Sequence, residues 1–204
     1  MKSSKKIHTS EEMILAAARK VFIQKGMDGA RMQDIADEAG INKALLHYYF
    51  TNKEMLFEKV FKEAASMLFE KMNSILDMEG SLFEKIRHFT DAYLSIVIEN
   101  PYIPVFVIGE MNRHPEIFMT KVMKIHPPQL IKLVAQIEQE VKAGIIHPIS
   151  PVQLIINLVS MTVFPFLGKP VIMQLMNVDE LQYRLILEQR KTVIADFIIA
   201  AIKK

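Results

Sequence analysis

The chain has 204 residues, half of them apolar, and its 25 Lys and Arg stand against 23 Asp and Glu. The length accommodates one or two domains with a sizeable core, and the apolar content excludes a disordered chain. Because the chain has no Cys, it has no disulfide framework, no thiol nucleophile and no Cys-ligated zinc site. The basic start leads into no apolar run, which predicts a cytoplasmic protein without a secretory signal.

Positive charge is concentrated in the first quarter of the chain. Residues 1–53 hold nine Lys and Arg against six Asp and Glu, whereas residues 54–204 hold 16 against 17. A mildly basic segment followed by a near-neutral, apolar body predicts two parts with different partners. We therefore expect two domains with these bounds. Since the net charge is only +2, any binding to nucleic acid has to be local.

Helix signals recur along the chain, and no segment alternates as a strand does. Several predicted helices begin at a polar cap followed three residues later by Glu or Gln, as at Ser81 and Glu84. Pro101 and Pro104 predict that the segment 100–113 is not one uniform helix from its start. The fold class is therefore predicted to be all-α. In chain order the predicted helices cover 9–26, 32–39, 43–50, 51–76, 81–100, shorter pieces punctuated by prolines up to Pro128, then 129–143, 151–167 and 177–201.

A membrane span is not expected, although no Lys, Arg, Asp or Glu occurs over 143–168. Pro151 and Pro165 limit the uninterrupted apolar stretch to about 13 residues, or roughly 20 Å of helix, whereas a bilayer core needs about 30 Å. A helix buried on nearly all sides, by its own core and by a partner subunit, explains the composition better.

The segment 31–53 carries the pattern of a helix–turn–helix motif. Gly40 lies between two short predicted helices, and a glycine can adopt the positive φ that a sharp bend requires. On the second helix, Lys43, Ala44, His47 and Tyr48 share one face, while Leu46 points into the packing. Such a basic, small and aromatic face is what a helix needs in order to enter the major groove of DNA.

Four runs in this region are similar to one family. Residues 34–36, 39–43, 46–50 and 53–56 read Asp-Ile-Ala, Ala-Gly-Ile-Asn-Lys, Leu-His-Tyr-Tyr-Phe and Lys-Glu-Met-Leu. On these runs, residues of about 8–68 resemble the N-terminal domain of the TetR/AcrR family of transcriptional repressors. The resemblance implies a three-helix DNA-binding domain, a C-terminal helical ligand-binding and dimerisation domain, and a homodimer on a double-stranded, palindromic operator.

The resemblance also implies roles for particular residues. Base-reading positions fall on Gln33 and Lys43, with Ala44 beside them. Asn42 belongs to the matching run. His47 stands where the family usually has Tyr, and Arg31 follows Ala30 where a Ser or Thr cap is usual, so an Arg–phosphate contact replaces that cap. The positions expected to contact phosphates are Arg31, His47, Tyr48, Tyr49 and Lys53. On a generic helix, Lys43 and Lys53 would be ordinary solvated charges.

The body is rich in Met and Phe, which suit the wall of a pocket for a small apolar or aromatic ligand. A closed core without a cavity is the plain alternative. Candidate pocket residues are Met67, Phe89, Tyr93, Tyr102, Phe106, Glu110, Met111, Asn112 and Met161. The last two helices are more apolar than one core requires, and the resemblance implies that they form the dimer interface through Leu158, Phe164, Leu181, Leu185, Val193, Ile194, Phe197 and Ile198.

We expect a repressor that a ligand releases from its operator. A regulator of the same fold that activates, or that acts without a small molecule, is the nearest alternative. An α-helical carrier of hydrophobic ligands, without DNA binding, is an alternative of a different class. No enzyme motif, cofactor site or metal-ligating His pair is found, and the spacing of Glu110 and His114 favours a surface ion pair over a catalytic dyad.

Overall fold

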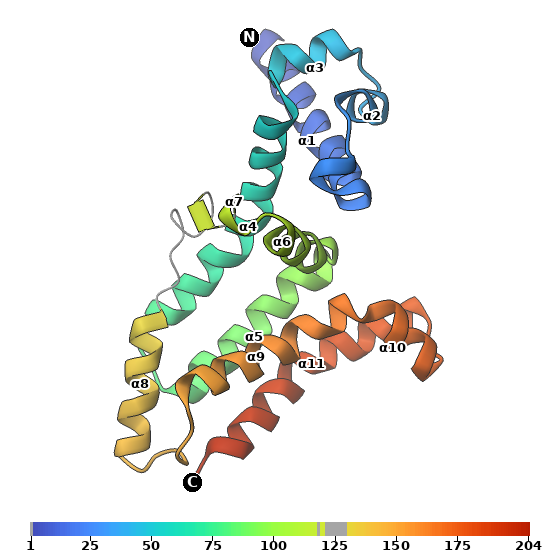
Figure 1. Cartoon of the computed structure of the whole chain (residues 1–204). Helices are drawn as coiled ribbons and strands as arrows, with labels where there is room; N and C mark the ends of the chain where they lie inside the picture. Colours follow the sequence, from blue (N-terminus) through green and yellow to red (C-terminus); the bar gives the residue numbers. More distant parts are fainter. Residues whose placement is uncertain (1, 118, 121–129) are drawn as a thin grey trace. The chain divides into compact units, whose positions relative to one another are not determined.

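A computed structural model describes residues 2–117, 119–120 and 130–204. Over this part the regular structure is helical, apart from one isolated bridge between Ile146 and Lys203, which confirms the all-α fold class (Figure 1). The chain forms two compact units. Unit 1 holds Met1–Ala65 and Phe106–Lys124, and unit 2 holds Ser66–Val105 and Ile125–Lys204. The predicted pieces around Pro127 and Pro128 lie outside the described residues.

Unit 1 is built around a cluster of aromatic rings. The ring of Phe57 meets that of Phe22 edge-on at 5.1 Å and stacks on that of Phe61 at 5.6 Å, and Phe106 closes the cluster 5.6 Å from Phe61. Edge-to-face and offset rings pack favourably at such distances. The helices that contribute to unit 1 are α1 (Lys2–Gly29), α2 (Met32–Glu38), α3 (Lys43–Tyr49), the first part of α4 (Lys53–Asp77), most of α6 (Tyr102–Arg113) and α7 (Pro115–Ile117).

Helix α1 differs from its predicted bounds at the start but breaks where expected. It begins at Lys2 rather than at Thr9, because the residues in between include no Gly or Pro that would stop a helix. Gly26 adopts a φ of 67° and interrupts the helical geometry there. A Cβ on Gly26 would lie 3.2 Å from Nη1 of Arg113, so both the conformation and the space favour glycine.

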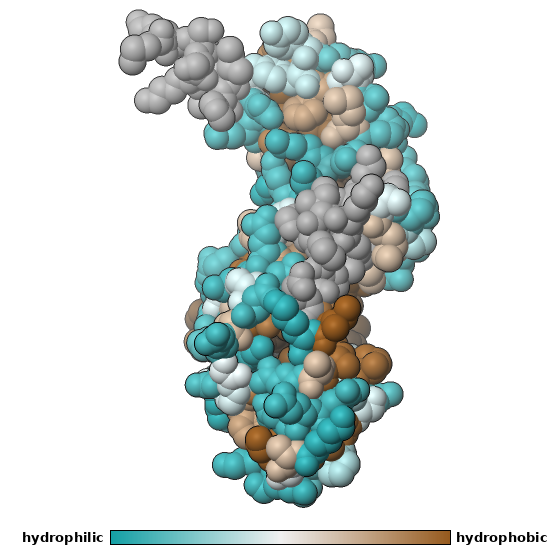
Figure 2. Space-filling model, turned by 90° about the vertical axis from the view of Figure 1, so that its left-hand side faces the viewer, coloured by the Kyte–Doolittle hydropathy of each residue, from teal (hydrophilic) through white to brown (hydrophobic). Residues whose placement is uncertain are grey.

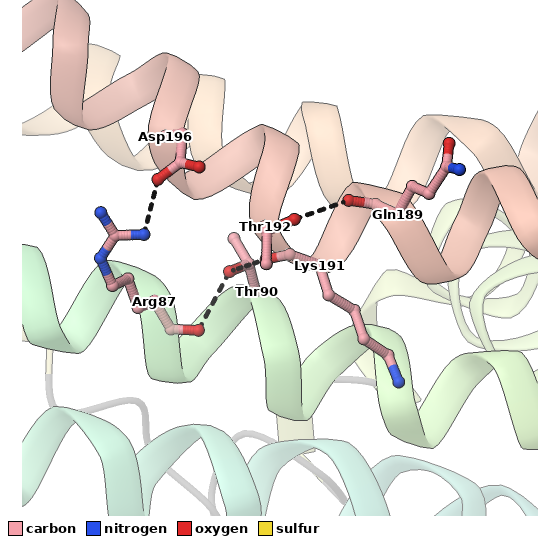
Figure 3. Close-up of polar contacts among 6 residues, drawn as sticks. All are labelled: Arg87, Thr90, Gln189, Lys191, Thr192 and Asp196. Atoms are coloured by element: carbon pink, nitrogen blue, oxygen red, sulfur yellow. Dashed lines mark hydrogen bonds and ion pairs between the residues drawn. The ribbon is translucent and has the colours of Figure 1, made fainter.

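Unit 2 is organised around the pair α5 and α11, which pack along each other (Figures 1 and 3). Arg87 of α5 pairs with Asp196 of α11 at 2.6 Å, and the hydroxyl of Thr90 donates to the carbonyl of Lys191 at 2.9 Å (Figure 3). The unit comprises the rest of α4, α5 (Leu82–Glu99), the start of α6, α8 (Leu130–Lys142), α9 (Pro151–Leu167), α10 (Lys169–Met176) and α11 (Glu180–Ile202).

The predicted cap of α5 is confirmed, but the start of the last helix was placed two residues too early and one helix was missed. Ser81 caps α5 with Glu84 three residues on, whereas α11 is capped by Asp179 with Gln182 rather than opened at Asn177. Helix α10 was not predicted; its signals were Pro170 near the start and Asn177, which ends it with a left-handed φ of 50°. The break at Pro101 is confirmed, whereas Pro104 lies in the first turn of α6, where no backbone N–H donor is needed.

No single helix among the described residues is long and apolar enough to cross a bilayer. The pairs α5 with α6 and α9 with α10 reach such a length only across a sharp bend.

Candidate nucleic-acid interface

A tight bend at Gly40 sets α3 against α2. Gly40 has a φ of 65°, and the N–H of Ile41 donates to the carbonyl of Ala36 at 3.0 Å, which closes the end of α2. Ile35 and Ala36 of α2 and Leu46 of α3 are fully buried. The buried face of α3 therefore rests on α2, and its other side chains are left for a partner.

The outer face of α3 is exposed and carries hydrogen-bond donors. Lys43, Ala44 and His47 are exposed, and Tyr48 is 81% exposed, although it is a large aromatic residue. Tyr49 is half-buried and meets the ring of Tyr48 edge-on at 5.4 Å. A rigid helix that holds an ammonium group, an imidazole and phenol hydroxyls toward solvent is suited to contact base edges and phosphates.

The start of each short helix is fixed by a side chain. Asn42 caps α3, since its Oδ1 accepts from the N–H of Leu45 at 2.8 Å. At α2 the backbone N–H of Arg31 donates to Asp34 at 3.2 Å, and Lys25 pairs with the same carboxylate oxygen at 2.8 Å. The hydrogen bond from Lys25 holds the pKa of Asp34 below its usual value, and the N–H of Arg31 acts in the same direction. Arg31 itself is exposed in extended conformation, free to reach a phosphate.

Three predicted residues have protein partners that the sequence analysis missed. The amide of Gln33 donates to Asp37 at 2.7 Å, and the (i, i+4) spacing of these two residues was the available signal. His47 Nδ1 lies 3.1 Å from the carbonyl of Thr51. Lys53 is half-buried, and its Nζ lies 3.5 Å from the carbonyl oxygen of Asp28, a long contact that leaves the ammonium available to another acceptor.

Comparison with known proteins identifies this motif. The profile of the family described as "Bacterial regulatory proteins, tetR family" matches residues 14–60, which cover the region from α1 into α4. The transcriptional repressor KstR2 of Mycolicibacterium smegmatis is 34% identical over 73 residues, 36% of each chain. The transcriptional regulator RutR of Escherichia coli is 27% identical over 154 residues, 76% of this chain and 72% of RutR. Residues 14–60 therefore match the tetR family of bacterial regulatory proteins, and the chain is similar to a transcriptional regulator over 76% of its length.

Solved structures show the same fold over nearly the whole chain. HlyIIR, a hemolysin II transcriptional regulator, is 24% identical with a TM-score of 0.64, covering 97% of this chain and 98% of HlyIIR. FadR of Bacillus subtilis, solved with stearoyl-CoA, is 17% identical with a TM-score of 0.64, covering 94% of this chain and 98% of FadR. Such likenesses show the fold. The aligned part of this chain spans only about a third of KstR2.

The predicted ligand residues are divided between the two units. In unit 1, Phe106 and Glu110 are buried, Met111 is half-buried and Asn112 is exposed. Glu110 pairs with Arg113 at 2.6 Å rather than with His114, and its Oε2 is buried without a partner in the described structure. Phe106 belongs to the aromatic cluster described above.

In unit 2, Tyr93 is the most enclosed of the predicted ligand residues. Its ring stacks on that of Phe89 at 5.9 Å, and burial raises the pKa of its hydroxyl. Tyr102 and Met161 are half-buried and Met67 is exposed. A groove of about 570 Å³ in this unit follows α8 instead, and its lining comprises Lys132, Ala135, Gln136, Gln139, Glu140, Ala143 and Ile145.

The predicted interface residues separate into two groups by exposure. Leu158, Ile194 and Ile198 are buried within the protomer, so they support its own core. The other five side chains are open to solvent. These are Phe164, Leu181, Leu185, Val193 and Phe197. Figure 2 shows that hydrophobic residues reach the surface among hydrophilic ones on one face of the molecule.

Proposed function

We propose that the chain is a homodimeric repressor that places the α3 helix of each subunit in the major groove of one half of a palindromic operator. The observation that carries the proposal is the exposed face of α3, with Lys43 and Tyr48 presented on a helix that buried Leu46 anchors. The family match supports DNA binding and does not favour a carrier without it. A regulator of this kind acts in the cytoplasm, where it reaches the chromosome.

Within this proposal the exposed side chains have two tasks. Lys43 reads bases together with Gln33, and small Ala44 allows α3 to approach the groove. Phosphate contacts position the helix without reading sequence. The residues assigned to phosphates are Arg31, His47, Tyr48, Tyr49 and Lys53, and Asn42 holds the start of α3 in shape.

The signal is proposed to be a small apolar or aromatic ligand bound in the helical body. The stacked pair Phe89 and Tyr93 supplies an aromatic wall in unit 2, and the stearoyl-CoA bound by FadR supports a ligand of apolar character. A ligand that prefers one spacing of the two reading heads lowers DNA affinity through a coupling of about 1–3 kcal/mol. The division into a DNA-binding domain at 1–53 and a ligand-binding body at 54–204 stays a prediction.

Selection of bound duplexes from a random DNA pool tests the proposal. We expect enrichment of a palindrome, and a binding constant that falls steeply with salt because Lys and Arg displace counterions from phosphates. Binding of the selected palindrome should require two subunits per duplex, measured by sedimentation of the complex. A pool that yields no enriched sequence, with no salt-dependent binding, would contradict the proposed function.

A further inference from the structure

Helix α8, drawn in yellow in Figure 1, carries the groove of about 570 Å³ along one of its faces. The lining residues of the helix recur at spacings of three and four, so they share one side of it. A groove of this volume is large enough to hold a small molecule. Its polar side chains gather on one side of Glu140 and its apolar end on the other: Lys132, Ala135, Gln136 and Gln139 precede Glu140, and Ala143 and Ile145 follow it.

Glu140 is a charged residue buried in the wall of this groove, with 9% of its surface exposed. Its Oε1 accepts from the backbone N–H of Leu82 at 3.1 Å and from the side-chain amide of Gln136 at 2.9 Å. Its Oε2 is buried and has no hydrogen-bond partner in the part of the chain that the structure describes. A buried carboxylate oxygen in this state is costly for the fold, so it favours a donor supplied by a ligand.

The side chain of Gln136 is fixed beside this carboxylate. Its amide nitrogen donates to Glu140 and also to the carbonyl oxygen of Gly80, at 3.0 Å. Both amide hydrogens are then used, and the Oε1 of Gln136 is left as a second acceptor. Gln139, one residue before Glu140, is exposed and adds a third side-chain oxygen to the lining.

The turn after α8 fixes the apolar end of the groove. Gly144 reverses the chain with a φ of 72°, and the N–H of Ile145 then donates to the backbone carbonyl of Glu140 at 3.0 Å. The turn is anchored to the end of α11, because the N–H of His147 donates to the carbonyl of Ile202 at 2.7 Å. Both ends of the groove are therefore held in place by hydrogen bonds of the chain itself.

The charges of the groove favour a cation over an anion. The one cationic residue of the lining, Lys132, is paired with Asp77, so an anion would have to displace a carboxylate. It would also approach the buried carboxylate of Glu140, which repels it. Among the described residues, no group of three or more His, Cys, Asp and Glu could hold a metal ion. The cation that fits is therefore an organic one.

We infer that the groove along α8 is a second ligand site, which takes a primary amine with a short apolar tail. The ammonium group donates to the Oε2 of Glu140 and to the side-chain oxygens of Gln136 and Gln139. The tail lies over Ala143 and Ile145. An ammonium group donates at single points, whereas a guanidinium matches two carboxylate oxygens at once, and one oxygen of Glu140 is already used. The site is separate from the aromatic wall proposed above and requires neither an operator nor a second subunit.

Calorimetric titration of the full chain with hexylamine at neutral pH, without DNA, tests the site. Three matched compounds each remove one feature of the amine. Hexyltrimethylammonium keeps the charge and the tail but has no N–H donor, hexanol keeps the tail without the charge, and hexanoate reverses the charge. We expect hexylamine to bind about tenfold more tightly than any of them, because hydrogen bonds between charged groups are the strongest. Hexylamine should also raise the melting temperature of the chain.

Variants of α8 locate the binding. Glu140→Gln should raise the dissociation constant of hexylamine about tenfold or more, because the amide has no charge to offer the ammonium group. Glu138→Gln is the matched control, since it removes the same charge from an exposed position on the same helix outside the groove lining, and it should change nothing. Ala143→Phe keeps Glu140 and places a ring one turn from it at an exposed position, so it should weaken binding by covering the approach. Melting temperatures establish that each variant folds.

Several results would overturn the site. They are an absence of hexylamine binding to the unmodified chain at millimolar concentration, equal binding by Glu140→Gln and Glu138→Gln, and unchanged binding by Ala143→Phe. Equal affinities for hexylamine and hexyltrimethylammonium would overturn the role of Oε2 as an acceptor, because charge alone would then explain the binding. These titrations contain no DNA, so each of these results leaves the proposed repressor standing. A chain that binds hexylamine but no operator would support the site and contradict the proposed function.

Discussion

Arg190 on α11 donates a hydrogen bond of 2.7 Å from Nη2 to the carbonyl oxygen of Met161 on α9. The usual donor to that carbonyl would be the backbone N–H four residues later, but Pro165 stands there and has none. The hydroxyl of Tyr183 donates to the carbonyl of Pro165 at 2.6 Å. Two side chains of α11 therefore satisfy backbone groups at the C-terminal end of α9, and they connect the two helices.

Removal of the Arg190 side chain should destabilise the fold, because the Met161 carbonyl then loses its donor. We expect Arg190→Leu to lower the free energy of unfolding by about 1–3 kcal/mol. Pro165→Ala restores a backbone N–H, so in that background Arg190→Leu should cost measurably less. Denaturant unfolding of the four variants at one protein concentration gives the coupling free energy. Additive effects would mean that Arg190 does not replace the missing donor.

Lys43 is the residue we expect to read a base. Lys43→Ala should lose about 1–3 kcal/mol of operator affinity and relax the preference at one position in each half-site, since Lys can donate to guanine O6 and N7. Lys59→Ala, on α4 and paired with Glu63, is the matched control and should leave the preference unchanged. Binding of each variant to a panel of single-base operator variants measures both its affinity and its base preference. A uniform loss across the panel would assign Lys43 to a phosphate.

Lys53 is expected to contact a phosphate from the first turn of α4. Lys53→Ala should weaken specific and non-specific DNA binding alike and reduce the slope of log K against log salt by about one unit. Lys53 Nζ lies 3.5 Å from the carbonyl oxygen of Asp28, so the substitution also removes a contact within the fold. Melting temperatures of the unmodified chain and of Lys53→Ala separate an effect on DNA binding from an effect on stability. An unchanged salt slope would place Lys53 away from the DNA.

Asp34 should make the stability of the DNA-binding region depend on pH in the acidic range. Lys25 and the N–H of Arg31 hold the pKa of Asp34 below its ordinary value of 3.8, so the carboxylate stabilises the folded state above that value. The contribution is lost as pH falls through the folded-state pKa. Asp34→Asn should therefore melt lower than the unmodified chain at pH 7, and the difference should begin to shrink below about pH 4. A difference that stays constant as the pH falls from 7 to about 2 would show that the amide disturbs α2 by another route.

Local signals located most helices, because caps and breaks depend on a few adjacent residues. Gly26 and Gly40 break the chain where predicted, each with positive φ, and Ser81 caps α5 as expected. The start of α1 was wrong, because a cap-like Thr9 is compatible with a helix that continues through it. Helix α10 was missed, since it has no buried stripe to produce a periodic pattern.

The assignment of apolar residues to a core or to an interface was beyond the sequence. On α11, Val193 and Ile194 are adjacent and equally apolar, yet Val193 is exposed and Ile194 is buried against the protomer's own helices. Which face turns inward is decided by packing on α5 and α9, between residues far apart in the chain. Long-range packing likewise closed Phe106 into the aromatic cluster of unit 1. The pair of Glu110 with Arg113 is local, at (i, i+3) spacing on α6, and was missed in favour of His114.

The ligand prediction centres on buried Tyr93, whose ring stacks on that of Phe89. Its hydroxyl can donate a hydrogen bond to, and accept one from, a polar group of a ligand. We expect 4-octylphenol to raise the melting temperature and weaken operator binding more than octylbenzene does, because only the phenol offers that bond. Tyr93→Phe should make the two compounds equivalent, through the loss of about 0.5–1.5 kcal/mol.

Half-buried Ala92, when replaced by Trp in a variant that still binds DNA, should abolish the response by filling the space. Compounds that raise the melting temperature while operator affinity stays constant would mean that this aromatic wall binds ligands without carrying the signal.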